Sequence, residues 1–167
     1  ALKHRGPDST GYALYADNDG QNFILRFKVG ENVGEGSTSV NEDESVYNER
    51  KKAVDKKLSE LGALVVKEEK LTPYSYRYEI KFDKDLMEFS KAIESIQSVE
   101  ILSIGKSLEL IKDLGDATVV SERYGLNKVQ GTHGIGHARM ATESGVDIKS
   151  AHPFWGYPFA DVSVVHN

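Results

Sequence analysis

A strict alternation of apolar and charged residues in the middle of the chain constrains its fold more than any other feature. Between residues 76 and 82 the two kinds of side chain take turns: Tyr76, Arg77, Tyr78, Glu79, Ile80, Lys81 and Phe82. Successive side chains of a β-strand point to opposite faces, so this pattern predicts a strand with one buried and one charged face. The apolar run at 63–66 and a turn at Thr72 and Pro73 precede it, and together they predict an antiparallel hairpin.

Segments on both sides of this hairpin carry alternating strand and helix patterns. Residues 23–29 have apolar side chains at every second position, and residues 99–104 form an apolar run. One helix is expected from a cap at Ser45 to a stop at Gly62, and a second helix after a cap at Asp83. The predicted order is therefore strand, helix, strand, strand, helix, strand.

That order is the ferredoxin-like βαββαβ arrangement, in which both helices cover one face of a four-stranded antiparallel sheet. We assign it to residues 23–104. The two ends of such a unit lie on neighbouring strands, so it can be inserted into a loop of a host domain. Within it, residues 30–45 are rich in Gly, Ser and acidic residues, a composition that predicts a mobile loop.

Composition excludes several classes of function. The 167 residues are 39% hydrophobic and 28% charged, and no stretch approaches the roughly 20 apolar residues that span a bilayer. A net charge of −5 argues against a nucleic-acid partner, because phosphate binding needs clustered Lys and Arg. Residues 1–8 lack the apolar core of a secretory signal, which favours the cytoplasm.

Cysteine is absent, which removes a disulfide framework, a thiolate metal site and a thiol nucleophile from the sequence as it stands. The chain does not begin with Met, and it ends directly after the apolar run at 162–165. We therefore expect it to be an interior piece of a longer chain.

Polar and glycine residues gather between residues 131 and 153, a combination that is commoner in sites than in cores. Residues 131–136 contain three glycines, but the G-x-G-x-x-G spacing of a phosphate loop is missing. The histidines nearby show no metal-ligand spacing, so no metal is expected. Arg139 stands among small and apolar neighbours and needs an anion, either Asp8 or Asp161 in an internal ion pair or the carboxylate of a ligand.

Four segments, in this order, resemble the motif series of class II (N-terminal nucleophile) glutamine amidotransferase domains: HRGPDSTG (4–11), GIGHARMATES (134–144), AHPF (151–154) and VVHN (164–167). The resemblance covers about half of the chain. It assigns residues 1–22 and 105–167 to the amidotransferase domain, incomplete at both ends, with residues 23–104 as the insert. The long interruption is similar to the archaeal-type amidotransferase subunit of glutamate synthase and its glutamate synthase-like relatives.

The resemblance implies an α+β fold, the αββα sandwich of N-terminal nucleophile hydrolases, and a glutaminase that passes ammonia to a synthase domain or subunit. It implies no cofactor, and it leaves a homo-oligomer open. In this class the nucleophile is an N-terminal Cys whose own α-amino group is the general base. That Cys would lie upstream of Ala1, so the sequence as it stands is expected to be inactive.

Site residues follow from their positions in the motifs. Arg139 would bind the α-carboxylate of glutamine, and Thr142 would line the same pocket. Asn167 would donate its side-chain amide to the oxyanion. The remaining matches surround the site: Arg5 and Gly6 in the wall beside the nucleophile, and His152 and Pro153 in a structural turn.

A second reading of the sequence comes from the missing Cys: a non-catalytic amidotransferase-like domain that binds glutamine or has a regulatory role. For the insert, a spacer or docking surface and an amino-acid sensor are both compatible with the pattern.

Overall fold

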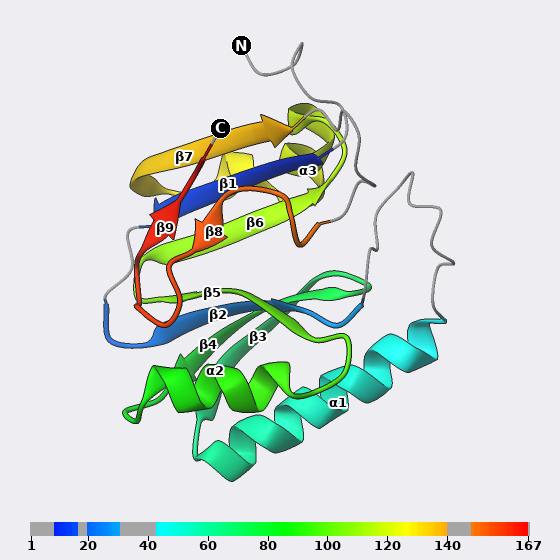
Figure 1. The fold of residues 1–167 in the computed structure, drawn as a ribbon, viewed down its shortest axis with the longest axis vertical. Coiled ribbons are helices and arrows are strands. Elements are labelled where there is room, and N and C mark those ends of the chain that lie inside the picture. Colours follow the sequence, from blue (N-terminus) through cyan, green and yellow to red (C-terminus); the bar gives the residue numbers. More distant parts are fainter. Residues whose placement is uncertain (1–8, 17–19, 31–42, 140–147, 167) are drawn as a thin grey trace.

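The computed structural model describes residues 9–16, 20–30, 43–139 and 148–166. Its architecture is mixed α and β, with antiparallel sheets (Figure 1). Most of the loop expected over residues 30–45 lies outside these ranges. No helix among the described residues has both the length and the apolar character needed to cross a membrane.

The larger sheet has four strands in the order β3 (Leu64–Thr72), β4 (Ser75–Lys81), β2 (Phe23–Lys28) and β5 (Glu100–Gly105). All neighbouring strands are antiparallel. The alternation over residues 76–82 has the predicted effect, because Tyr76, Tyr78 and Ile80 are buried on one face. Along the chain the elements follow one another as strand, helix, strand, strand, helix, strand, the order that the apolar pattern predicts.

Helix α1 (Glu44–Leu61) begins two residues earlier than expected. The Asp43 carboxylate, and not the predicted Ser45 hydroxyl, caps it by accepting a hydrogen bond from the Ser45 backbone amide at 3.2 Å. An ionised carboxylate also suits the positive end of the helix dipole. The predicted stop is confirmed, since Gly62 adopts φ 82°, a left-handed conformation that glycine reaches without strain.

Helix α2 (Leu86–Glu94) is capped by Asp85, so the predicted cap at Asp83 is wrong by two residues. The Asp85 carboxylate accepts a hydrogen bond from the backbone amide of Glu88 at 2.9 Å. A side-chain cap reaches only two or three residues ahead, which places Asp83 too far from the first turn.

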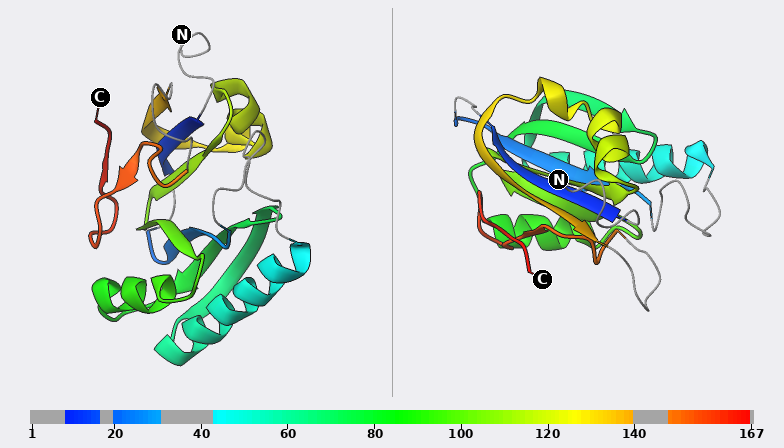
Figure 2. Two further views of the ribbon diagram at one scale, coloured as in Figure 1. Left: turned by 45° about the vertical axis from the view of Figure 1, so that its right-hand side comes forward. Right: turned by 90° about the horizontal axis from the view of Figure 1, so that it is seen from above.

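Both helices pack on the same face of the larger sheet, as Figures 1 and 2 show from different sides. The core between them is made by the apolar face of the strands and the inward stripes of the helices: Leu25, Phe27, Val29, Tyr47, Val54, Leu58, Ala63, Tyr76, Tyr78, Ile80, Phe89, Ile93, Val99, Ile101 and Ile104. The opposite face of the sheet lies toward a second, smaller sheet.

The smaller sheet has three strands in the order β6 (Leu108–Leu114), β1 (Ser9–Ala16) and β7 (Gly131–Arg139), all antiparallel. Helix α3 (Ala117–Arg123) and the short helix η2 (Leu126–Lys128) connect β6 to β7.

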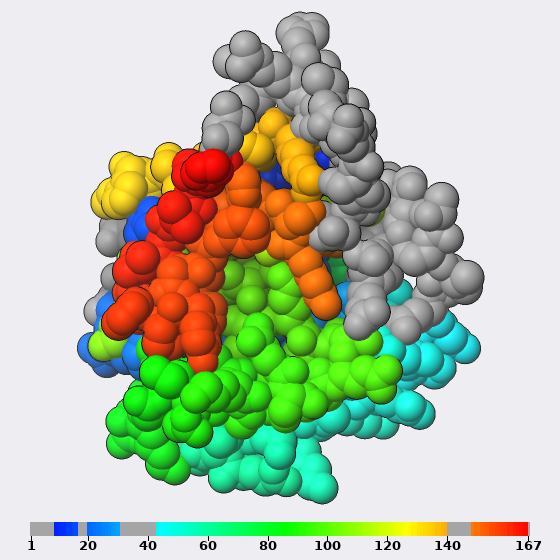
Figure 3. Space-filling model, viewed as in Figure 1, coloured from blue at the N-terminus to red at the C-terminus, as the bar shows by residue number. Residues whose placement is uncertain are grey.

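A two-stranded pair follows, formed by β8 (Phe154–Trp155) and β9 (Ser163–Val164). In Figure 3 the segment that contains them lies along the surface, from the smaller sheet to helix α2 below the larger sheet. A hydrogen bond from the Tyr157 hydroxyl to the Met87 carbonyl, at 3.4 Å, fastens this segment to α2.

Charged side chains and an apolar cluster that includes Leu102, Leu108 and Leu110 share the space between the two sheets. Glu109 on β6 is 3% exposed and accepts hydrogen bonds from Arg26 on β2 and Arg77 on β4. The Arg26 Nε and Arg77 Nη2 atoms each lie 2.8 Å from a Glu109 oxygen. Burial alone would raise the pKa of Glu109, but the hydrogen bonds and charges of the two arginines outweigh it and hold the pKa below its ordinary value. Glu109 is therefore ionised and bridges the sheets.

A second buried carboxylate lies further along β6. Asp113 accepts hydrogen bonds from the hydroxyl groups of Tyr74, at 2.9 Å, and Tyr124, at 2.8 Å. The Lys28 ammonium lies 3.7 Å from Asp113 and donates to the Lys112 carbonyl at 2.7 Å. Burial lowers the pKa of Lys28 to about 8, although the nearby Asp113 carboxylate opposes this shift.

The tight turn between β5 and β6 is fixed by Asp161, which comes from the segment between β8 and β9. One oxygen of its carboxylate accepts hydrogen bonds from the backbone amides of Ser107, at 2.7 Å, and Leu108, at 2.8 Å. Gly105 is required here, because a Cβ atom at that position would lie 2.5 Å from the same carboxylate oxygen.

We predict that Glu109→Gln destabilises the protein by about 3 kcal/mol or more, because it leaves Arg26 buried without a countercharge and leaves Arg77 with Glu69 alone. The control is Glu88→Gln, which removes an exposed pair with Lys91 and should cost much less. Urea unfolding of both variants measures the two values. Equal losses would contradict the structural role of Glu109.

Asp161→Asn should lower stability by about 1 to 2 kcal/mol at pH 7, because a hydrogen bond to a charged acceptor is stronger than one to an amide. Asparagine also tolerates the φ of 61° at this position, so the substitution should not change the backbone strain.

The same variant predicts a pH dependence. Burial disfavours the Asp161 carboxylate, but the backbone hydrogen bonds from Leu108, Ser107 and Lys106 outweigh burial and lower its pKa below 3.8. A lowered pKa stabilises the folded state above the unfolded-state pKa, and this contribution is lost as pH falls through the folded-state pKa. Urea unfolding between pH 7 and pH 3 should show the difference between the two proteins closing in acid. A constant difference would contradict the assignment.

Candidate functional site

Strands β1 and β7 bring the first two motif segments side by side. Their antiparallel register places Ser9 opposite Arg139 and Gly11 opposite His137. Side chains two residues apart on a strand share a face, so these four positions face the same side of the sheet. The other face of β1 is turned to α3, where the Tyr12 hydroxyl donates to the Ala117 carbonyl at 2.9 Å.

The third motif segment lies directly on this shared face. A Cβ atom at Gly11 would overlap the carbonyl oxygen of His152 and approach the Pro153 ring to 2.9 Å. The His152–Pro153 peptide bond is cis. The ring of His152 stands edge-on to the His137 ring with 4.7 Å between their centroids. Gly11 is therefore a position where two chain segments touch with no room for a side chain.

The fourth motif segment joins the others through β9. Phe154 of β8 pairs with Val164 of β9. The hydroxyl groups of Ser163 and Tyr15 lie 2.9 Å apart, which ties β9 back to β1. All four motif segments therefore have described residues in one region of the molecule, although they are far apart in the sequence.

Arg139 ends strand β7 on the face that carries Ser9. It is partly buried, and its Nη1 atom donates to the hydroxyl and, at 3.4 Å, to the carbonyl of Ser150. Of the two internal partners considered from the sequence, Asp8 lies outside the described residues and Asp161 caps the turn between β5 and β6. Ser150 holds the guanidinium at the edge of the shared face, where it can meet a carboxylate.

Three buried polar atoms lie around this face with no hydrogen-bond partner among the described residues: Ser9 Oγ, His137 Nδ1 and His152 Nδ1. Buried polar atoms in proteins nearly always have a partner, so these atoms suit a polar ligand or water. Burial, followed by the nearby His137 and His166 rings, lowers the pKa of His152, which is therefore neutral near pH 7.

Of the site residues expected from the sequence, Arg139, His152 and Pro153 lie in this region. Four others lie outside the described residues: Arg5, Gly6, Thr142 and Asn167. Sequence reasoning did not single out Ser9 or Ser150. Ser9 lies inside the first motif segment, and that position could have marked it as a candidate. Ser150 lies directly before the third segment, and nothing in the sequence marks it.

Three known proteins are similar in sequence to this chain. Across its whole length the chain is 34% identical over 174 residues to a putative glutamine amidotransferase of Methanothermobacter thermautotrophicus, and it covers 52% of that protein. About two fifths of the chain, 69 residues, is 44% identical to the glutamine amidotransferase-like protein GlxB of Rhizobium meliloti, covering 22% of it. These matches support a glutamine amidotransferase-like family.

A third relative is more distant. Over 70 residues, 42% of the chain, there is 34% identity to a glutamine–fructose-6-phosphate aminotransferase of Pyrobaculum aerophilum, of which 12% is covered. The chain thus spans about half of the first relative and less of the other two. No family model matches it, and no solved structure matches it significantly.

Gly11→Ala should destabilise the protein by about 1 to 3 kcal/mol, because the added methyl group displaces the His152 carbonyl from β1. The control is Gly136→Ala on the neighbouring strand, where a Cβ atom would be 3.3 Å from the Tyr12 ring and should cost much less. Thermal and urea unfolding compare the two. If both variants are equally stable, the third motif segment does not pack on β1 as described.

Proposed function

We propose that this chain is the glutamine-binding part of a class II, N-terminal nucleophile glutamine amidotransferase domain. In this proposal the complete domain hydrolyses glutamine to glutamate and ammonia, and the ammonia passes to a glutamate synthase-like partner. The first two relatives, which carry glutamine amidotransferase in their names, support the glutamine-utilising part of the proposal.

The observation that carries the proposal is the position of Arg139 on a polar face shared by the motif segments. Arginine presents parallel N–H groups that match the two oxygens of a carboxylate. Its Nη1 atom is oriented by Ser150, and Ser9 stands opposite it on β1. An amino-acid carboxylate bound there would meet a preorganised cation, and Thr142 is proposed to line the same pocket.

The chemistry would depend on groups beyond the described residues. A Cys thiol upstream of Ala1 would attack the side-chain amide carbon of glutamine after giving its proton to the α-amino group of the same Cys. The tetrahedral intermediate would place its oxyanion near the Asn167 amide. Collapse of the intermediate would release ammonia and leave a γ-glutamyl thioester, which water then hydrolyses to glutamate.

Residues around the pocket have separate proposed roles. Arg5 and Gly6 would form the wall beside the nucleophile, while His152 and Pro153 would hold the turn that covers Gly11. His152 is neutral near pH 7 because its pKa is lowered, so it adds no positive charge beside the proposed substrate.

We also infer that residues 23–104 form a ferredoxin-like subdomain inserted into the amidotransferase domain of residues 1–22 and 105–167. The order of elements and the strand order β3-β4-β2-β5 support this. In the same proposal, the β6-β1-β7 sheet and the β8-β9 pair belong to the αββα sandwich.

Arg139→Ala in the full-length protein should weaken glutamine binding about 10- to 100-fold, the equivalent of losing one or two charge-assisted hydrogen bonds. Arg139→Lys is the matched control, since it keeps the charge but not the two-pronged geometry, and should have a smaller effect. Calorimetric titration with glutamine gives the affinities, and thermal unfolding checks the fold. A change within about threefold for Arg139→Ala would contradict the carboxylate contact.

Measuring glutamine turnover distinguishes the proposed glutaminase from a non-catalytic amidotransferase-like domain. Full-length protein that releases glutamate from glutamine, and is labelled by a glutamine-analogue electrophile, is a glutaminase. Glutamine binding with neither glutamate release nor labelling would instead identify a non-catalytic glutamine-binding or regulatory domain.

A further inference from the structure

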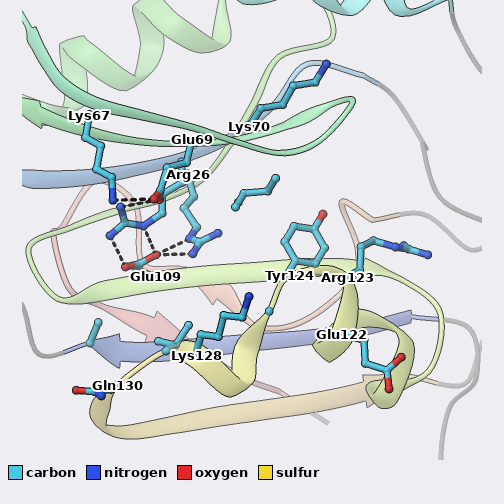
Figure 4. A pocket seen from close by; sticks show the side chains of 15 residues that line it. Arg26, Lys67, Glu69, Lys70, Glu109, Glu122, Arg123, Tyr124, Lys128 and Gln130 are labelled. Atoms are coloured by element: carbon cyan, nitrogen blue, oxygen red, sulfur yellow. Dashed lines mark hydrogen bonds and ion pairs between the residues drawn. The ribbon is translucent and has the colours of Figure 1, made fainter.

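A cleft of about 940 Å³ opens between the two sheets, on the side of β3 and α3 (Figure 4). Its upper wall comes from β3 and β4 of the larger sheet, and its lower wall from α3, η2 and the residues that follow. The size lies within the range of small-molecule sites. The charged residues that line it are six cations and three anions: Arg26, Lys67, Lys70, Arg77, Arg123, Lys128, Glu69, Glu109 and Glu122.

At one end of the cleft, cations outnumber the carboxylates that neutralise them. Glu109 is shared by Arg26 and Arg77, and Arg77 also pairs with Glu69 at 3.1 Å. Lys67 pairs with the same Glu69 at 2.8 Å. Three cations therefore share two carboxylates, which leaves one positive charge. Arg26 and Arg77 are held in place by these contacts, so their charges are preorganised.

Lys128 adds a second positive charge from the opposite wall. Its side chain rises from η2 toward the group formed by Arg26 and Glu109 (Figure 4). Within the described residues, no hydrogen bond or ion pair engages its ammonium group. Glu122 does not neutralise it, because its carboxylate lies at the other end of the cleft in the same view.

Other cations of the cleft have carboxylate partners outside it, and Asp113, the partner of Arg123, is shared with Lys28. Lys70 pairs with Glu44 at 2.6 Å, and Arg123 pairs with Asp113 at 3.2 Å. The excess of about two positive charges thus arises at the end of the cleft that carries Lys67, Arg26 and Lys128. It occurs in a chain whose net charge is −5, so it is not a consequence of overall composition.

We propose that this cleft binds a compact oxyanion carrying two negative charges, either a small dicarboxylate or a diphosphate group. Arginine and lysine are the side chains that recognise both kinds of anion. Such a ligand would lie between Lys128, which follows the smaller sheet's strand β6 in the chain, and the ion pairs that Arg26 and Arg77 of the larger sheet form. Its binding would strengthen the contact between the two sheets.

This site is separate from the proposed glutamine site. The two are linked through strands β6 and β1, because Glu109 lies on β6 and β6 pairs with the strand that carries Ser9 and Gly11. A ligand that changes the packing at Glu109 can therefore influence the glutamine site. The binding itself does not depend on the proposed glutaminase activity.

Isothermal titration calorimetry of the full-length protein with succinate and with pyrophosphate, at low salt and without glutamine, tests the proposal. At least one of the two should bind with one-to-one stoichiometry, and the affinity should fall as salt is added. Lys128→Gln should weaken binding about tenfold, and Lys128→Glu should weaken it further. Lys56→Gln, a charge removed from an 80% exposed side chain on α1, should leave the affinity unchanged.

Binding of succinate alone would identify the ligand as a dicarboxylate, and binding of pyrophosphate alone would identify it as a diphosphate. The proposal is overturned if neither anion binds saturably, or if Lys128→Gln and Lys56→Gln have the same effect. Both lysines are exposed, so the variants should fold, and equal melting temperatures would verify this. A negative glutaminase assay would leave these outcomes unaffected, because no step of the titration needs turnover.

Discussion

Two buried carboxylates on β6 hold the larger and the smaller sheet together. Glu109 and Asp113 lie on one face of β6, and both are almost completely buried. A buried charge is tolerated only with a partner and hydrogen bonds, so each carboxylate fixes the cations and hydroxyl groups around it. Arg26, Lys28 and Arg77 supply those cations from β2 and β4. These pairs fix the position of one sheet on the other, because a shift along the strands would separate them.

That position in turn sets the candidate site. Strand β6 pairs with β1, and β1 pairs with β7, so the register of the smaller sheet is transmitted from the ion pairs to the face that carries Ser9 and Arg139. The turn capped by Asp161 contributes from the other side, since it joins the segment between β8 and β9 to the start of β6. The glutamine site that we propose therefore rests on contacts made by the larger sheet as well as by its own sheet.

The sequence predicted what depends on local periodicity and little of what depends on pairing across the chain. Alternation at residues 76–82 and the helical spacing before Gly62 gave the right elements, because burial of one face imposes its period on the residues. Both helix caps were misplaced by two residues, since several acids near each start could have served. The pairing of Arg26 with Glu109 spans 83 positions, and nothing in the local sequence distinguishes these charges from exposed ones. Arg139 was singled out through its motif segment, whereas Ser150, which accepts hydrogen bonds from it, had no such signal.

A polar interface between the sheets has a different consequence from an apolar one. Apolar packing of the same area would serve stability at least as well, because desolvation offsets much of what a buried ion pair contributes. Ion pairs instead make the relative position of the sheets depend on charge. Burial lowers the pKa of Lys28 to about 8, so this ammonium group of the interface loses its proton at a lower pH than an exposed lysine does. The cleft next to Glu109 extends the same layer to the surface, where Lys128 can bring in a charge that comes from solution. An interface held by charge is thus the part of this fold through which a small anion could alter the distance between the two sheets. The strand that carries Ser9 and Gly11 would move with the smaller sheet.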